Sequence, residues 1–105
     1  MKKLRLSLEL FKEGVYYCLE GDTLSDIAIR FSTSKELIIK DNRLTQDIKV
    51  GDALYIRRYK KTYCVKVGDT PETVAKALNL SVDETYELNK TNYLYPFLTV
   101  VSDKE

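Results

Sequence analysis

Two stretches of the chain share one order of apolar and polar positions at an offset of 47 residues. Between them, seven positions are identical. Four intervening pairs keep their apolar class: Cys18 and Val65, Ile27 and Val74, Phe31 and Leu78, and Ile39 and Tyr86. The identical pairs are Tyr16 and Tyr63, Gly21 and Gly68, Asp22 and Asp69, Thr23 and Thr70, Ala28 and Ala75, Ser34 and Ser81, and Asn42 and Asn89. Chance rarely aligns a Gly-Asp-Thr triplet with so many spaced partners, so the chain contains an internal repeat.

Each copy of the repeat predicts a strand followed by a helix. The segments 16–19 and 63–67 are rich in the aromatic and β-branched residues that favour strands, and a glycine turn ends each segment. Thr23 and Thr70 are of the type that caps a helix N-terminus, and Pro71 suits the first helical position because it lacks a backbone N–H. The apolar stripe of the following helices points toward a core: it consists of Leu24, Ile27, Ala28 and Phe31, then Val74, Ala75 and Leu78.

A second helix and a closing strand complete each copy. Ser34 and Ser81 are the expected helix caps, and the helices are expected to end near Asn42 and Asn89. Asparagine tolerates the left-handed conformation that ends many helices. The closing strands are predicted over residues 53–56 and 98–101. The sequence therefore predicts an α+β fold built from two tandem β-α-α-β modules.

Both copies resemble the LysM domain, a β-α-α-β module of about this length, and the resemblance covers about residues 15–101. In the second copy, Pro71 stands where the family usually has leucine, and Phe97 stands where it usually has the glycine of a Pro-Gly turn. The fuller match, in the first copy, is carried by Tyr16, Gly21, Asp22, Thr23, Leu24, Ile27, Ala28, Phe31, Ser34, Asn42, Ile48, Gly51, Asp52, Leu54 and Ile56.

Four segments follow from the repeat and its flanks. They are an N-terminal amphipathic strand over 1–14, a first LysM-like module over 15–57, a short basic linker over 58–62 and a divergent second module over 63–105. Leucine alternates with polar residues in the first segment, as on a strand with one apolar face. An uncovered strand of this kind would be prone to aggregate. We therefore expect it to pack on the repeats or on another chain, through Leu4, Leu6, Leu8 and Leu10.

LysM domains as a family bind glycans that contain N-acetylglucosamine, such as peptidoglycan and chitin, and catalyse no reaction. Their shallow groove lies between the loop before the first helix and the loop before the last strand. The resemblance therefore implies ligand-binding positions in each copy. In the first copy these are Gly21, Asp22, Thr23, Leu24, Leu44, Thr45, Gln46, Asp47 and Ile48. In the second copy they are Gly68, Asp69, Thr70, Pro71, Thr91, Asn92, Tyr93 and Leu94.

The same residues also have a purely structural interpretation. A Gly-Asp-Thr triplet forms a turn and a helix cap whether or not a ligand binds, and capping is the main role we expect for the two threonines. Asn42 and Asn89 are expected to anchor loops rather than to contact a ligand. Phe97 and a loop that is one residue shorter would reshape the second groove, so the first copy is the expected site if only one binds.

The amino-acid composition of the chain excludes several classes of function. The chain has 105 residues, of which 44% are hydrophobic and 31% are charged, and its net charge is +1. This balance gives no general electrostatic attraction to nucleic acid or to an anionic membrane, and no apolar run is long enough to span one. Histidine is absent, which excludes Ser-His and Cys-His nucleophile pairs. We expect a protein that is not an enzyme and that needs no cofactor and no metal.

The two cysteines are too few for a disulfide framework. Cys18 aligns with the inward-facing Val65, whereas Cys64 is one residue out of phase, so the two thiols face opposite sides of their strands. Opposite faces argue against a bridge between them within one chain. Cys18 is expected in the core, and Cys64 is expected at the surface.

Two functions fit these features. The first is a non-catalytic module that binds a cell-wall glycan. The second is a bacterial or phage assembly adaptor on a LysM scaffold, in a spore envelope or in the baseplate of a phage tail or contractile particle. The leucine segment would then contact protein partners or a second copy. Arg5, Glu9 and Lys12 interrupt any secretory signal, so we expect synthesis in the cytoplasm and, in the second case, incorporation into a cell envelope, spore or phage-like particle.

Overall fold

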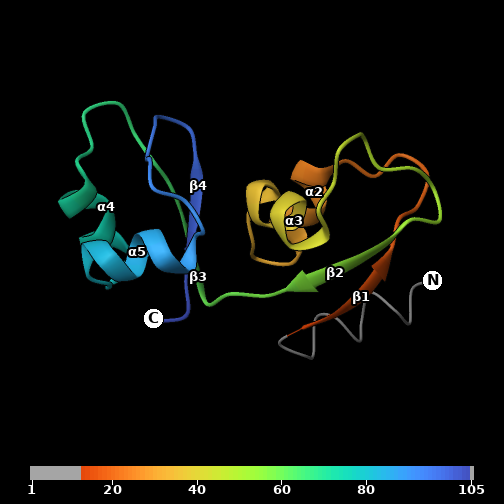
Figure 1. Cartoon of the computed structure of the whole chain (residues 1–105), viewed down its shortest axis with the longest axis horizontal. Coiled ribbons are helices and arrows are strands. Elements are labelled where there is room, and N and C mark those ends of the chain that lie inside the picture. The colour runs from red at the N-terminus through yellow and green to blue at the C-terminus, as the bar shows by residue number, and fades with distance from the viewer. Residues whose placement is uncertain (1–12, 105) are drawn as a thin grey trace. The chain divides into compact units, whose positions relative to one another are not determined.

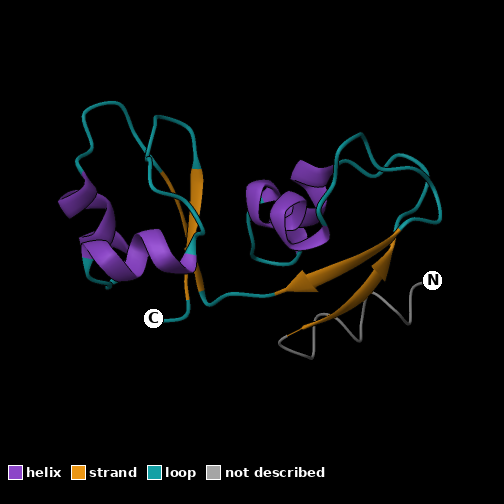
Figure 2. Cartoon of the chain, in the orientation of Figure 1, coloured by secondary structure: helices purple, strands orange, loops and turns teal. Residues whose placement is uncertain are grey.

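The computed structural model describes residues 13–104, which form two compact units that divide between Arg58 and Tyr59 (Figure 1). We call them the first module (13–58) and the second module (59–104). Each module contains two helices and one antiparallel sheet of two strands (Figure 2). The α+β fold with two repeated modules is therefore confirmed. The predicted N-terminal strand with Leu4, Leu6, Leu8 and Leu10 lies outside the described residues.

The first module follows the predicted order. It consists of β1 (Glu13–Tyr17), α2 (Leu24–Arg30), α3 (Lys35–Asn42) and β2 (Ala53–Arg57). β1 and β2 pair antiparallel, and alternate residues of the two strands turn toward the helices. The core that results is formed by Tyr16, Cys18, Ile27, Ala28, Phe31, Ile38, Leu54 and Ile56.

The second module repeats this architecture. Its elements are β3 (Lys61–Cys64), α4 (Pro71–Leu78), α5 (Val82–Leu88) and β4 (Thr99–Ser102). β3 and β4 pair antiparallel, and β3 begins inside the segment that was predicted as linker. The core is formed by Val65, Val74, Leu78, Leu98 and Val100. The helix stripe expected from the sequence, Val74, Ala75 and Leu78, is buried in full.

The predicted boundaries of the opening strands are wrong by two or three residues. β1 covers 13–17 instead of 16–19, and β3 covers 61–64 instead of 63–67. Each strand starts early because its partner continues past the predicted closing segment, so that Glu13 lies opposite Arg57. Sequence composition indicates a strand, but the length of the partner decides where pairing begins and ends.

The four helix caps expected from the sequence are all confirmed. Each cap has a side-chain oxygen that accepts the backbone N–H of the residue three positions further along the chain. The caps are Thr23, Ser34, Thr70 and Ser81. Pro71 occupies the first turn of α4. Each of these bonds satisfies an N–H group that the helix itself leaves unpaired, which contributes about 1 kcal/mol per cap.

The left-handed residues at the helix ends are not the two asparagines. Arg43 (φ 51°) and Lys90 (φ 52°) adopt this conformation, whereas Asn89 does not (φ −88°). The two helices end near Asn42 and Asn89 as expected, and the side chains of these asparagines have another role. Each asparagine bonds the last strand of its module as a neighbouring strand would.

In the first module, Asn42 Nδ2 donates to Ile38 O and Tyr55 O, both at 2.9 Å, and Asn42 Oδ1 accepts from Tyr55 N at 2.7 Å. In the second module, Asn89 Nδ2 donates to Val101 O at 3.2 Å, and Asn89 Oδ1 accepts from Val101 N at 2.7 Å. The asparagines therefore anchor the second helix to the closing strand rather than to a loop.

Phe97 occupies a glycine position. In the first module, Gly51 (φ 89°) donates its N–H to Cys18 O at 2.8 Å, and in the second, Phe97 (φ 75°) donates to Val65 O at 2.7 Å. The two residues are thus equivalent, although one has a side chain. A left-handed backbone costs a residue with a Cβ about 1–2 kcal/mol. Phe97 is 80% exposed, so burial of its ring does not offset that strain.

The substitution Phe97→Gly is expected to raise the free energy of unfolding of the second module by about 0.5–1 kcal/mol, because relief of strain exceeds the added freedom of glycine in the unfolded chain. Urea unfolding monitored by circular dichroism measures the change. Gly51→Ala is the matched control: a Cβ there meets no atom within 4 Å, so strain alone should destabilise the first module. A destabilised Phe97→Gly protein would contradict the assignment.

The two thiols should differ in reactivity, since both are free and only Cys64 is exposed. Burial raises the pKa of the Cys18 thiol, and the carboxylates of Asp22 and Asp52 raise it further. Iodoacetamide at pH 8 is expected to label Cys64 rapidly and Cys18 only after unfolding. Mass spectrometry of the labelled wild type measures both rates, and the Cys64→Ser protein isolates the rate of Cys18. Equal labelling rates in the native protein would show that the core around Cys18 is open.

Candidate functional site

Two loops lie together at one end of the first module. They are the loop that leads from β1 into α2 and the end of the loop that leads from α3 into β2 (Figure 1). Cys18 N donates to Asp52 O at 2.9 Å, and Gly51 N donates to Cys18 O at 2.8 Å. These bonds continue the sheet beyond its strands and fix one loop beside the other.

The second module repeats the arrangement. Val65 N donates to Leu98 O at 2.8 Å, and Phe97 N donates to Val65 O. Figure 1 shows the loop from β3 to α4 and the loop from α5 to β4 at the same end of this module, away from the C-terminus. The pairs of loops that the family resemblance implied as binding loops therefore lie together in both modules.

The carboxylate of Asp22 holds the first loop of the first module. Its Oδ2 accepts the hydroxyl of Tyr16 at 2.5 Å and the backbone N–H of Leu19 at 2.8 Å. Arg30 approaches the other oxygen at 3.6 Å, and the Asp22 side chain is only 6% exposed. Asp22 was a candidate ligand contact. In the structure, its carboxylate is engaged by the protein and closes the turn.

Asp69 does the same in the second module with different partners. Its Oδ2 accepts the Tyr63 hydroxyl at 2.7 Å and the Lys66 N–H at 2.8 Å, and its Oδ1 accepts the Thr73 hydroxyl at 2.8 Å. The backbone bond from Lys66, followed by the bonds from Tyr63 and Thr73, lowers the pKa of Asp69. The hydrogen bond that Tyr63 donates to Asp69 raises the pKa of the Tyr63 hydroxyl.

Apolar residues of the predicted first site come together on the core. Leu24, Leu44 and Ile48 are partly buried and pack against the same cluster of the first module. Between Leu44 and Ile48, the side chains of Thr45, Gln46 and Asp47 are exposed. Gly21 and Thr23 are exposed on the facing loop. The predicted first site is therefore an edge of the core bordered by exposed polar loop residues.

The predicted second site is less uniform. Gly68, Thr70, Asn92 and Tyr93 are exposed, whereas Leu94 packs against the core. The remaining predicted residues, Asp69, Pro71 and Thr91, are partly buried. The Thr91 hydroxyl serves the loop itself, because it donates to Tyr93 O at 3.0 Å and accepts from Tyr93 N at 3.3 Å.

Three apolar side chains lie beside this site, and sequence reasoning singled out only Phe97 among them. Val67, Tyr95 and Phe97 are exposed, and the Tyr95 ring lies 5.7 Å from the ring of Tyr93 at an angle of 34°. The signal that was present is Phe97, since it replaces a glycine of the family pattern. Nothing in the sequence alone indicated that the neighbouring side chains are also exposed.

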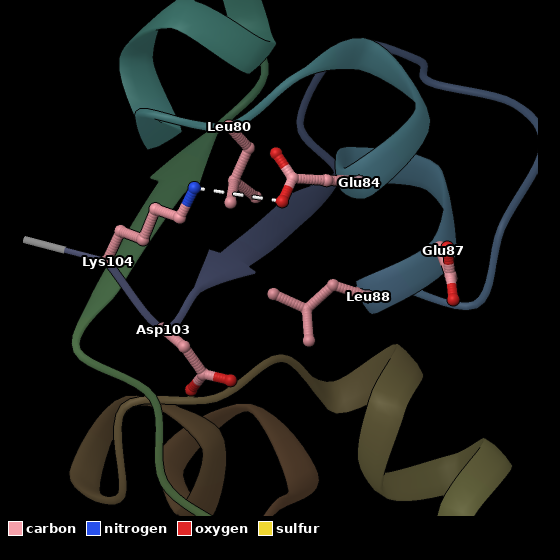
Figure 3. Close-up of a pocket in the computed structure, with 6 residues that line it drawn as sticks. All are labelled: Leu80, Glu84, Glu87, Leu88, Asp103 and Lys104. Atoms are coloured by element: carbon pink, nitrogen blue, oxygen red, sulfur yellow. Dashed lines mark ion pairs between the residues drawn. The ribbon is translucent and has the colours of Figure 1, made fainter.

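A separate hollow of about 310 Å³ lies at the other end of the second module (Figure 3). Leu80 and Leu88 form its apolar wall, and an ion pair of 3.7 Å between Lys104 and Glu84 crosses its rim. Glu87 and Asp103 complete the lining. No residue of the predicted sites contributes to this hollow, so it is distinct from the loop-bearing end.

Within residues 13–104, no group of three acidic or cysteine side chains is arranged to hold a metal ion. The loops instead present backbone groups, hydroxyls and apolar edges, which suit recognition of a neutral polar ligand. No helix in this part of the chain has the length and apolar character needed to cross a membrane.

Comparisons with known proteins identify the repeat. A family model described as the LysM domain matches residues 19–57 and 63–100. Among solved structures, the spore cortex-lytic enzyme SleL of Bacillus cereus is 21% identical over 90% of this chain and 23% of that chain, with a TM-score of 0.43. SleL of Bacillus megaterium QM B1551 is 25% identical over 86% of this chain and 22% of that chain, with a TM-score of 0.42. The chain thus spans less than a quarter of either enzyme. Curated proteins gave no match.

The Asp69 carboxyl is expected to titrate below its ordinary pKa of 3.8, because three hydrogen bonds favour its charged form. Its contribution to stability is therefore complete above the unfolded pKa and is lost as the pH falls through the lower folded pKa. Carbon-13 NMR of the carboxyl measures the midpoint. The Asp69→Asn protein should be less stable at pH 7 and less sensitive to acid below pH 4. A midpoint above 3.8 would show that the hydrogen bonds do not persist in solution.

Proposed function

The chain belongs to the LysM domain family, and from this premise we propose that it is a non-catalytic protein that binds N-acetylglucosamine-containing glycans, either peptidoglycan or a chitin-like polymer. One observation carries the proposal. Each module presents two loops that backbone bonds hold side by side, and an aspartate fixes the turn of one of them. A surface formed before the ligand arrives loses little conformational entropy on binding.

The chemistry of the first module suits an acetylated amino sugar. Exposed loop groups around Gly21 and Thr23, together with the polar segment 45–47, offer donors and acceptors for an acetamido group and for hydroxyls. Leu24 and Ile48 are only partly buried, so each can cover an apolar sugar face while it remains packed on the core. This combination of an apolar edge with a few polar groups is typical of small-molecule sites.

Weak binding per module is expected. A shallow site of this size corresponds to a Kd of about 1 mM, or roughly −4 kcal/mol. If the spacing of the two sites matches that of the glycan, one polymer engages both modules, and the second contact then benefits from a raised effective concentration. Affinity should therefore rise with the length of the glycan. That dependence separates polymer recognition from binding of single sugars.

The alternative function, an assembly adaptor, depends on the leucine segment. Leu4, Leu6, Leu8 and Leu10 lie outside the described residues, so no observation of the structure favours that role.

The purified chain is expected to sediment with bacterial sacculi and to bind N-acetylglucosamine oligomers with an affinity that rises with length. Leu24→Ser and Ile48→Ser should each weaken the first module about threefold to tenfold, because each removes an apolar contact with the sugar. Nitrogen-15 NMR titration measures affinity and also verifies the fold. Ile29→Ser is the matched control, since Ile29 is 79% exposed at the far end of α2. A folded wild-type chain that binds neither sacculi nor oligomers would refute the proposed function.

A further inference from the structure

Four large side chains lie exposed at the loop-bearing end of the second module. We call Val67, Tyr93, Tyr95 and Phe97 the aromatic tip; their exposed fractions are 78%, 66%, 40% and 80%. We propose that the aromatic tip is a stacking subsite for a pyranose ring, which extends the second module's glycan site by a further sugar. The inference rests on the proposed function and deepens it.

Hydrogen bonds bring the two parts of the tip together. One turn is closed by Asp69 N donating to Lys66 O, and it carries Val67. The other is closed by Leu98 N donating to Tyr95 O, and it carries Phe97. Both turns flank Val65, whose N–H and C=O bond the second turn at 2.8 and 2.7 Å. Val67 and Phe97 therefore lie on adjacent turns of one rigid end.

The tyrosines link this end to the predicted groove. The rings of Tyr93 and Tyr95 lie 5.7 Å apart, and the backbone of Tyr93 is bonded in both directions by the Thr91 hydroxyl. Tyr93 is itself one of the predicted glycan-binding positions. The aromatic tip is thus continuous with the candidate site instead of forming a separate patch, which favours a sugar of the same polymer as its occupant.

The backbone of Phe97 gives an independent reason to assign a function. A residue with a side chain is strained at φ 75°, and the equivalent residue of the first module is Gly51. The ring gains no burial in return. Strain without compensation in the fold is characteristic of residues that serve binding. In the first module the position equivalent to Val67 is the charged Glu20, so the tip is a property of the second module alone.

The chemistry of the tip suits a neutral ring. None of its four side chains is charged, and aromatic rings attract the C–H groups that form the apolar face of a β-linked hexosamine. The hydroxyls of Tyr93 and Tyr95 can bond the sugar's own hydroxyls at the ring edge. With this subsite, the second module should gain more affinity from a longer oligomer than the first module does. The sequence alone had favoured the first module as the binding site.

Titration of the nitrogen-15-labelled full chain with tetramers and hexamers of N-acetylglucosamine tests the inference. Phe97→Gly and Phe97→Asn remove the ring while keeping residues that tolerate the left-handed backbone, and Phe97→Tyr keeps the ring. Both removals should raise the hexamer Kd reported by the amides of residues 66–70, 91–95, 97 and 98 about fivefold. The Tyr variant should bind as the wild type does, and amides of the first module should report an unchanged Kd where a hexamer occupies one module at a time.

The outcomes separate the two proposals. If the second module of Phe97→Gly binds the hexamer as tightly as the wild type, the stacking subsite is refuted and glycan binding stands. If the wild type neither responds to any oligomer nor sediments with sacculi, the proposed function fails and the subsite fails with it. Because Phe97→Gly is expected to stabilise the fold, weaker binding by this variant cannot result from unfolding.

Discussion

The carboxylate of one aspartate holds the loop-bearing end of each module in place. In the first module, Asp22 accepts bonds from the otherwise buried Tyr16 hydroxyl and from the Leu19 N–H. The Tyr16 hydroxyl also accepts from Arg30 Nη1 at 3.2 Å, but its own proton needs an acceptor. A buried donor without an acceptor would cost about 1–3 kcal/mol, so the bond to Asp22 ties the turn to the core. Asp69 has the same role in the second module. The next helix begins directly after this turn, and the neighbouring loop is bonded to the adjacent residue Cys18 in the first module and Val65 in the second. Both proposed binding surfaces depend on this geometry.

All seven identities of the internal repeat have a structural role. The tyrosine and aspartate bond each other, the glycine has a positive φ, the threonine and serine cap helices, the alanine is buried, and the asparagine holds the closing strand. The repeat therefore records what the fold requires, and differences in function must lie in residues that differ between copies. Phe97 against Gly51 is the clearest of these differences, because it changes an exposed surface at the expense of backbone strain.

The sequence alone predicted the features that depend on neighbouring residues. Helix caps, element order and the inward position of Cys18 follow from local patterns, and the structure confirms them. Strand ends were misplaced because a partner strand decides them. Asn42 was expected to anchor a loop, and its bonds to the closing strand were not predicted because that strand is distant in sequence. The roles of Asp22 and Asp69 stayed open at the sequence level, since a Gly-Asp-Thr turn does not reveal which groups will meet the carboxylate. Exposure of Val67 and Tyr95 likewise depends on packing.

Hydrogen exchange at the amides of Leu19 and Lys66 tests the central claim most directly. Both N–H groups lie in loops, and each donates at 2.8 Å to the aspartate of its own module. If the aspartates hold these turns as described, both amides will exchange slowly, with protection close to that of the core amide of Val74. Replacement of the aspartate by alanine will then remove that protection locally. Exchange of both wild-type amides at the rate of an open loop would contradict the account.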